Sequence, residues 1–319
     1  MSSGAVAESV AVNPFDQLSQ RDPTGEVDLE NPPAVLAAIK AILDGLYGDA
    51  YRYELIAQAV DDVVAAFRGA YPGLLRCDTL YHDLRHALET GLTMARLLDG
   101  HAQSLPPDSA EKIDGEHAVL GLLLAFFHDI GLLRRVGEDH LWGAVLTPIH
   151  EERGVEFMRP YLAPTALAPL ADKAELIMAT KLVFRIPATW PAPDRLLASL
   201  VATADLMSQL ADRCYLEKCR DFLFLEFSAI GLAGAENTPY PDRETLLAKT
   251  PGFHSGLIRQ RLDEEFSGVH KLLGTHFKGA NPYEAAIQRN LSYLAAALAE
   301  QDLTRLRRRP RTFVDESKD

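Results

Sequence analysis

The sequence has little of what marks disulfide-rich, secreted or membrane-spanning proteins. Its 319 residues include only three cysteines, Cys77, Cys214 and Cys219, and their number and spacing fit neither a disulfide framework nor a zinc knuckle. The first residues lack a basic cluster followed by a long apolar core, which argues against a secretory signal. The most apolar run, 118–127, is about half of the ~20 residues needed to cross a bilayer. We therefore expect reduced thiols, a cytoplasmic location and no membrane contact.

An excess of basic residues is also missing. There are 32 lysines and arginines against 45 aspartates and glutamates, which gives a formal net charge of −13. Nucleic-acid backbones select basic surfaces, so this balance argues against nucleic acid as the partner. A small anionic substrate remains compatible with the charge, provided that metal ions supply local positive charge.

The pattern of apolar residues predicts an all-α fold. Strand-like alternation is nearly absent, and apolar residues recur at intervals of three and four. Between proline and glycine breakers, we predict helices over 33–43, 53–68, 81–98, 115–133, 148–161, 169–183, 193–228, 242–247, 253–274 and 282–300.

The same pattern predicts the organisation of the chain. We expect a loose N-terminal arm over 1–32, one helical domain over 33–302 with its catalytic segment at about 78–230, and a polar C-terminal tail over 303–319. The apolar stretch 291–298 fits either the closing of the core or a dimer face, which leaves a homo-oligomer open.

Two histidines four residues apart are the first candidates for chemistry. His82 and His86 lie on one face of a predicted helix, about one turn apart. Leu88 and Leu92 form an inward stripe beside them, so we expect His86 to face the interior or a cleft. The alternative is a core histidine satisfied by ordinary hydrogen bonds.

Two further polar groups interrupt apolar helices. His128 and Asp129 end the run 118–127, and Asp205 interrupts the apolar stretch 200–207. A buried carboxylate requires a cation or many donors, and a divalent metal ion also accepts neutral imidazole. The alternatives are an exposed, capped helix end at residues 128–129 and a buried salt bridge at Asp205.

Taken together, these elements predict a metal centre. Two histidines and two aspartates on three helices offer mixed nitrogen and oxygen ligands and leave positions for water and substrate. The expected cofactor is one or two divalent ions, with Mg, Mn, Fe and Zn all compatible.

The order of these residues resembles the HD-domain superfamily of metal-dependent phosphohydrolases. More narrowly, Tyr81-His82-Asp83-x-x-His86-Ala87 resembles the Tyr-His-Asn-x-x-His-Ala motif of the class I cyclic-nucleotide phosphodiesterases. The resemblance extends over residues 78 to 230 and includes three more stretches: Ile177-Met-Ala-Thr180, Thr203-Ala-Asp205-Leu, and Tyr215 with Leu225-Glu-Phe227.

The resemblance implies a fold, an activity and a set of roles. It implies that His86, His128, Asp129 and Asp205 bind the main metal ion, that Asp129 also bridges to a second ion, and that His82 is the general acid. The implied reaction is attack of a metal-activated water on the phosphoester of a nucleotide-like substrate, with a 3′,5′-cyclic nucleotide as the sharpest version.

The sequence departs from the phosphodiesterases at several positions. Leu132 stands where they have a histidine, Lys181 stands where they have an aspartate, and no counterpart of their nucleobase-clamping glutamine is evident. These departures concern nucleotide specificity rather than the metal ligands.

Four more residues are candidates for the site. His150 begins a predicted helix 22 residues after His128 and is either a ligand to a second metal or part of a solvent-facing helix start beside two glutamates. Lys181, Arg134 and Arg135 are candidates for binding the substrate phosphate.

Two other functions remain open at this point. Some HD-fold proteins hold a di-iron centre and use oxygen, although Thr180-Lys181 occupies the stretch where a further histidine would be expected. The other alternative is a non-catalytic helical module that binds a metal or a nucleotide.

Overall fold

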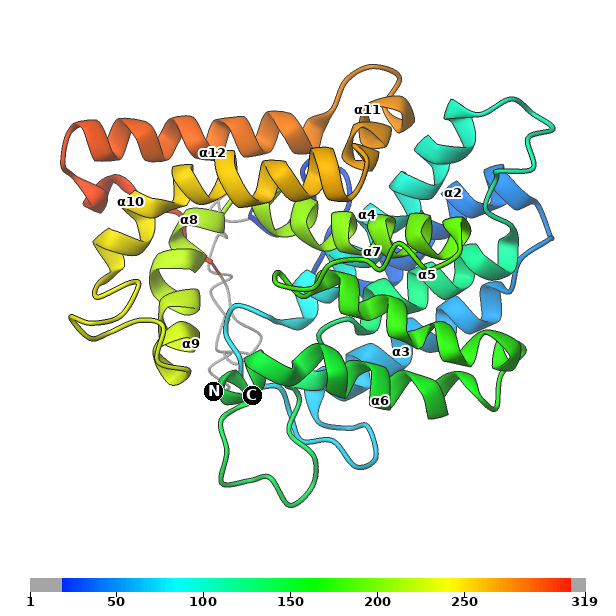
Figure 1. Cartoon of the computed structure of the whole chain (residues 1–319), viewed down its shortest axis with the longest axis horizontal. Helices are drawn as coiled ribbons and strands as arrows, with labels where there is room; N and C mark the ends of the chain where they lie inside the picture. Colours follow the sequence, from blue (N-terminus) through cyan, green and yellow to red (C-terminus); the bar gives the residue numbers. More distant parts are fainter. Residues whose placement is uncertain (1–18, 311–319) are drawn as a thin grey trace, which may run out of the picture.

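The computed structural model describes residues 19–310, which form an all-α fold without a β-strand in that range (Figure 1). The α-helices, labelled as in Figure 1, are α2 (Pro32–Tyr47), α3 (Tyr53–Arg68), α4 (Leu84–Ser104), α5 (Gly115–Phe127), α6 (His150–Leu162), α7 (Ala192–Ala211), α8 (Tyr215–Lys218), α9 (Phe224–Ala229), α10 (Arg243–Phe253), α11 (Leu272–His276) and α12 (Pro282–Ala299). The 3-10 segments that border the site are η1 (Ile130–Leu132), η2 (Gly143–Ile149) and η3 (Ala168–Thr180). The prediction of an all-α fold is therefore confirmed.

The core is built around α4, which packs against α2, α5, α7 and α11. Nearly every residue of α4 is buried, and so are all residues of α5 from Ala118 to Phe127. The two helices approach closely at Gly91, where a Cβ atom would lie 2.1 Å from the Phe126 ring. The stretch Gly115–Leu132 is apolar and long enough to span a membrane, but 89% of it is buried inside the protein, as in a core helix.

The start of α4 is determined by a cap that also positions a site residue. Asp83 adopts an extended backbone conformation, and its Oδ1 accepts a hydrogen bond from the His86 backbone N–H at 2.9 Å. Aspartate is among the preferred N-cap residues because it satisfies an otherwise unpaired helix donor. The helix predicted from residue 81 therefore begins at Leu84, with His86 in its first turn.

The helix predicted over 193–228 is interrupted. Helix α7 ends at Ala211, and α8 and α9 follow after a turn, with a π-helical segment, Cys219–Leu223, between them. Asp212 is the residue after α7, and its buried carboxylate accepts the Cys214 backbone N–H at 2.7 Å, pairs with Lys218 Nζ at 2.7 Å and lies 3.6 Å from Arg85 Nη2. The break in this helix therefore coincides with a charge network inside the core rather than with a proline or glycine.

The segment predicted as a helix over 253–274 also differs from the prediction. It contains two π-helical segments, His254–Ile258 and Arg261–Glu265, and then a 3-10 turn before α11. Helix α10 extends to Phe253, so Pro251-Gly252, in the gap between the predicted helices 242–247 and 253–274, lies within its last turn.

Residues 19–31, which belong to the predicted N-terminal arm, pack against the helical domain. Asp22 is buried and pairs with Arg96 on α4 at 2.7 Å, and Leu29 is fully buried in the core. The predicted polar tail also packs against the domain up to residue 310: Leu306 is buried, and the Arg308 backbone N–H donates to Glu217 at 3.1 Å. The remaining parts of the predicted arm and tail, 1–18 and 311–319, lie outside the described residues.

Candidate metal centre

Three of the predicted ligands form a buried group that can hold a metal ion. His86 from α4, His128 at the end of α5 and Asp205 from α7 bring their ligand atoms within 4.8 Å of one another. His86 Nε2 lies 3.1 Å from Asp205 Oδ1 and 3.2 Å from His128 Nε2. His128 Nε2 and Asp205 Oδ1 are 3.6 Å apart.

Asp129 lies at the edge of the same group. Its Oδ2 is 3.1 Å from His128 Nε2 and 3.7 Å from His86 Nε2. This oxygen is buried and has no hydrogen-bond partner among the described residues. A buried carboxylate oxygen without a donor is costly, so the position favours a cation.

The orientation of His128 makes it ready to bind a metal ion. Its Nδ1 lies 2.8 Å from the carbonyl oxygen of Ala125. A carbonyl can only accept, so Nδ1 carries the hydrogen, and Nε2 of the neutral ring presents its lone pair to the cluster. Metal-binding histidines are commonly held in this way, with the second ring nitrogen donating to a carbonyl or carboxylate.

The spacing of the four side chains matches ligands around one ion. Two ligand atoms about 2.1 Å from the same metal lie about 3.0–3.4 Å apart when their bond angle is about 90–109°. Three of the pairs described above are 3.1–3.2 Å apart and two are 3.6–3.7 Å apart. The group of His86, His128 and Asp205 could therefore hold a divalent ion, with Asp129 at its edge, and a small adjustment brings the longer pairs into range.

The histidines and aspartates of the cluster shift one another's pKa values, as oppositely charged neighbours do. Burial is the largest single influence on Asp129 and would raise its pKa, but His128, His82 and His86 together hold this pKa well below its usual range. Burial would lower the pKa of His128, yet Asp129 and Asp205 raise it well above the ordinary value. The carboxylates therefore stay ionised and require a positive partner, which is either a proton on the imidazoles or a metal ion.

His150 faces the other oxygen of Asp129. Its Nε2 lies 3.5 Å from Asp129 Oδ1, and its Nδ1 donates to the Thr147 carbonyl at 2.6 Å. His150 and Glu151 are buried, whereas Glu152 is exposed, so the His150 side chain itself does not face the solvent. Asp129 thus directs one oxygen toward the His86–His128–Asp205 group and the other toward His150.

His82 borders this cluster, with its ring centroid 6.4 Å from that of His86, and it is held by Glu226, a residue that is not among the predicted site residues. Glu226 on α9 lies 2.6 Å from His82 Nδ1 and also accepts the backbone N–H groups of Leu80 and Tyr81. The His82 ring centroid lies 6.3 Å from that of His150. Burial alone would lower the pKa of His82, but Glu226, followed by Asp129, raises it to about 9.

Gln209 also contacts the cluster without being among the predicted site residues. Its Nε2 donates to Asp205 Oδ1 at 2.9 Å, and its Oε1 accepts from the Tyr81 hydroxyl at 3.0 Å. It thereby connects a candidate ligand to the segment that carries His82. Its position four residues after Asp205, on the same face of α7, was the available signal.

The three basic residues predicted to bind phosphate are already engaged by carboxylates. Lys181 Nζ lies 2.7 Å from Glu152 and 3.5 Å from Glu151, at the border of the cluster. The other two pair elsewhere, at 3.1 Å in Arg134–Asp78 and 2.8 Å in Arg135–Glu156. Arg135 instead lines a separate cavity with Ile130 and Gly131.

Comparisons with protein-family models, with curated proteins and with solved structures give no match. The interpretation of the cluster therefore depends on its geometry and on the chemistry of its side chains.

Proposed function

We propose that this protein is a metal-dependent phosphohydrolase of the HD type. The observation that supports this most is the buried convergence of the His86 and His128 imidazoles with the Asp205 carboxylate, with an Asp129 oxygen 3.1 Å from His128 Nε2. Mixed nitrogen and oxygen ligand sets of this kind suit Mg, Mn, Fe or Zn in a hydrolytic site.

The residues divide into two groups of metal ligands. In this proposal His86, His128, Asp129 and Asp205 hold the main ion, and Asp129 with His150 holds a second. A divalent ion at this position lowers the pKa of a water molecule and neutralises the oxygens of a phosphoryl group. Gln209 keeps the Asp205 carboxylate oriented through its amide hydrogen bond.

His82 is proposed to donate a proton to the leaving oxygen. Glu226 accepts the Nδ1–H, and this leaves Nε2–H of the imidazolium as the proton donor. Glu226 is the largest of the groups that raise the pKa of His82, and this favours the protonated ring. A positioned acid of this kind typically contributes about 10²–10⁴-fold to the rate.

The charges around the cluster limit the class of substrate. Lys181 is balanced by Glu152 and Glu151, so bound metal ions would be the main positive charges available to a substrate. This suits a substrate with one phosphoester group better than a polyphosphate. A nucleotide-like phosphodiester, with a 3′,5′-cyclic nucleotide as the sharpest candidate, fits that description.

A hydrolysis assay with metal add-back tests the proposal. The purified chain would be stripped of metal and given bis-p-nitrophenyl phosphate or a panel of cyclic nucleotides, with Mg, Mn, Fe, Co or Zn restored one at a time. We expect turnover that depends on an added metal and is lost in His128→Ala. His101→Ala, which removes a buried histidine at the far end of α4, is the matched control and should retain activity. Absence of turnover with every metal would contradict the proposal.

A further inference from the structure

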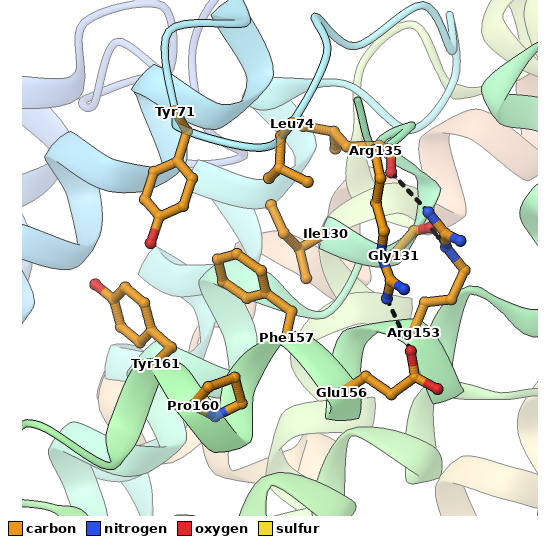
Figure 2. A pocket seen from close by; sticks show the side chains of 11 residues that line it. Tyr71, Leu74, Ile130, Gly131, Arg135, Arg153, Glu156, Phe157, Pro160 and Tyr161 are labelled. Atoms are coloured by element: carbon orange, nitrogen blue, oxygen red, sulfur yellow. Dashed lines mark hydrogen bonds and ion pairs between the residues drawn. The ribbon is translucent and has the colours of Figure 1, made fainter. Parts of the chain in front are cut away.

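A cavity of about 460 Å³ lies beside the candidate metal centre, between the 71–74 turn, η1 and α6 (Figure 2). Its volume falls within the range of small-molecule sites, which are mostly apolar and contain a few polar groups. The residues proposed to hold metal do not line it. The cavity is therefore a separate feature that the proposed hydrolase chemistry leaves unused.

One side of the cavity is aromatic. Figure 2 shows Tyr71, Phe157 and Tyr161 gathered on this side, away from the charged groups. The ring centroids are 5.6 Å apart for Tyr71 and Phe157, and 5.7 Å apart, in stacked geometry, for Phe157 and Tyr161. The Tyr161 hydroxyl donates to Asp62 at 2.8 Å, which holds its ring in place. Such a wall favours a flat aromatic ligand, because aromatic rings associate by offset stacking and edge contacts.

The opposite side carries two arginines with different roles. Arg153 is buried, and its guanidinium donates to the carbonyl oxygens of Gly131 and Leu133 and to Glu138. It is therefore used to hold the backbone.

Arg135 also lines the cavity and is half-exposed, and its Nη2 donates to Glu156 Oε2 at 2.8 Å. The contact with Glu156 uses one of the five N–H donors of the guanidinium. Lys181 differs, because its three N–H groups are all taken up by the Pro148 carbonyl and the Glu152 carboxylate. Arg135 can therefore also bind an anionic group of a ligand.

We propose that this cavity binds a small aromatic anion, with its ring against Tyr71, Phe157 and Tyr161 and its single negative group on Arg135. The cavity is separate from the candidate metal centre, because Phe157 lies about 10 Å along α6 from His150, at about 1.5 Å per residue. The proposal does not depend on the assignment of hydrolase activity.

The site is nevertheless joined to the metal centre by a rigid connection. Helix α6 begins with His150 and carries the aromatic wall in its later turns. Gly131 packs so closely on this helix that a Cβ atom there would lie 1.9 Å from the His150 carbonyl oxygen. A ligand between η1 and α6 therefore touches the two elements that position Asp129 and His150.

Titration of the full chain with anilinonaphthalene sulfonate tests the proposal. This dye combines an aromatic ring system with one negative group and fluoresces when it leaves water. We expect saturable binding at one site, weakened about tenfold or more by Arg135→Ala, because a hydrogen bond to a charged group is lost. The matched control is Arg305→Ala, since the Arg305–Glu300 pair has nearly the same exposure, 43% and 60%, as Arg135–Glu156, 45% and 64%.

A second variant tests the cavity without changing a charge. Leu74→Trp places a larger side chain in the cavity, and we expect it to abolish the saturable binding while the circular dichroism spectrum stays unchanged. Equal weakening by Arg135→Ala and Arg305→Ala would overturn the proposal. Dye binding that persists in a folded Leu74→Trp protein would overturn it as well.

Discussion

Replacing Glu226 with glutamine isolates the role of the His82–Glu226 pair. The substitution keeps the size of the side chain and an oxygen that can accept the backbone N–H groups of Leu80 and Tyr81. It removes the negative charge that lies 2.6 Å from His82 Nδ1. The expected consequence is loss of the imidazolium, with the metal ligands left in place.

The magnitude follows from the pKa of His82. Burial lowers this pKa, and Glu226 is the largest of the groups that raise it to about 9 from the ordinary 6.5. At a pH of about 7.5 the ring is then about 97% protonated, whereas a pKa of 6.5 or below leaves about 10% or less. We therefore expect Glu226→Gln to lower turnover at least about tenfold near this pH on substrates with poor leaving groups, with the loss shrinking as the pH falls toward 6.

The assay compares two leaving groups over a range of pH. The kcat/KM of wild type and Glu226→Gln would be measured from about pH 6 to 9 with an alkyl phosphodiester and with an activated aryl phosphodiester, whose leaving group requires little protonation. Glu217→Gln is the matched control, because Glu217 is also buried and accepts a backbone N–H, from Arg308, away from His82.

Two results would refute the role of Glu226 in keeping His82 protonated as an acid. One is an unchanged pH profile of Glu226→Gln with the alkyl substrate. The other is an equal loss with both substrates, which would indicate general damage to the site rather than loss of an acid. An NMR titration of the His82 ring provides a readout independent of turnover, and the pKa should fall from about 9 to about 6.5 or below in Glu226→Gln.

Three further substitutions test the packing around the site. Asp22→Asn leaves the Arg96 guanidinium buried without its counter-ion, and the free energy of unfolding in urea should fall by about 3–5 kcal/mol; a loss below about 1 kcal/mol would contradict this. Burial raises the pKa of Glu89 from 4.5 to about 8, so wild type loses stability as the pH rises through that window, by up to about 1.4 kcal/mol per unit. Glu89→Gln should therefore gain stability relative to wild type as the pH rises, and parallel profiles would refute this. Gly131→Ala forces a Cβ atom against the His150 carbonyl and should cost about 1–3 kcal/mol in thermal unfolding; wild-type stability would refute the close contact.

Local patterns predicted much of the fold. Helix α3 begins and ends at the predicted residues, because its amphipathic repeat is followed by Gly69 in the left-handed conformation. The segment after α7 was predicted less well. Its apolar repeat continues past Asp212, but the helix breaks there, where the Asp212 carboxylate forms buried ion pairs with Arg85 and Lys218, and periodicity does not detect such pairs.

The candidate site was predicted through its buried polar residues. His86, His128, Asp129 and Asp205 stand out because polar groups in apolar helices require partners, and the structure brings their side chains together. The role of Glu226 could not be predicted from local patterns, because its contact with His82 joins residues 144 positions apart.

The partners of the basic residues could not be predicted from the sequence. A sequence cannot tell which carboxylate a surface arginine meets, and Arg135 pairs with Glu156 at a different cavity. Arg134 pairs with Asp78 in the same way.

Metal stoichiometry is the most direct test of the central claim. Wild type, Asp129→Ala, His128→Ala and the His101→Ala control would be dialysed against Mn or Zn, and the bound metal would be measured by mass spectrometry. We predict one or two ions per chain in wild type and in the control, and loss of bound metal in both ligand variants. Unchanged metal content in Asp129→Ala and His128→Ala, or a folded wild type that binds no metal, would contradict the assignment of this cluster as a metal centre.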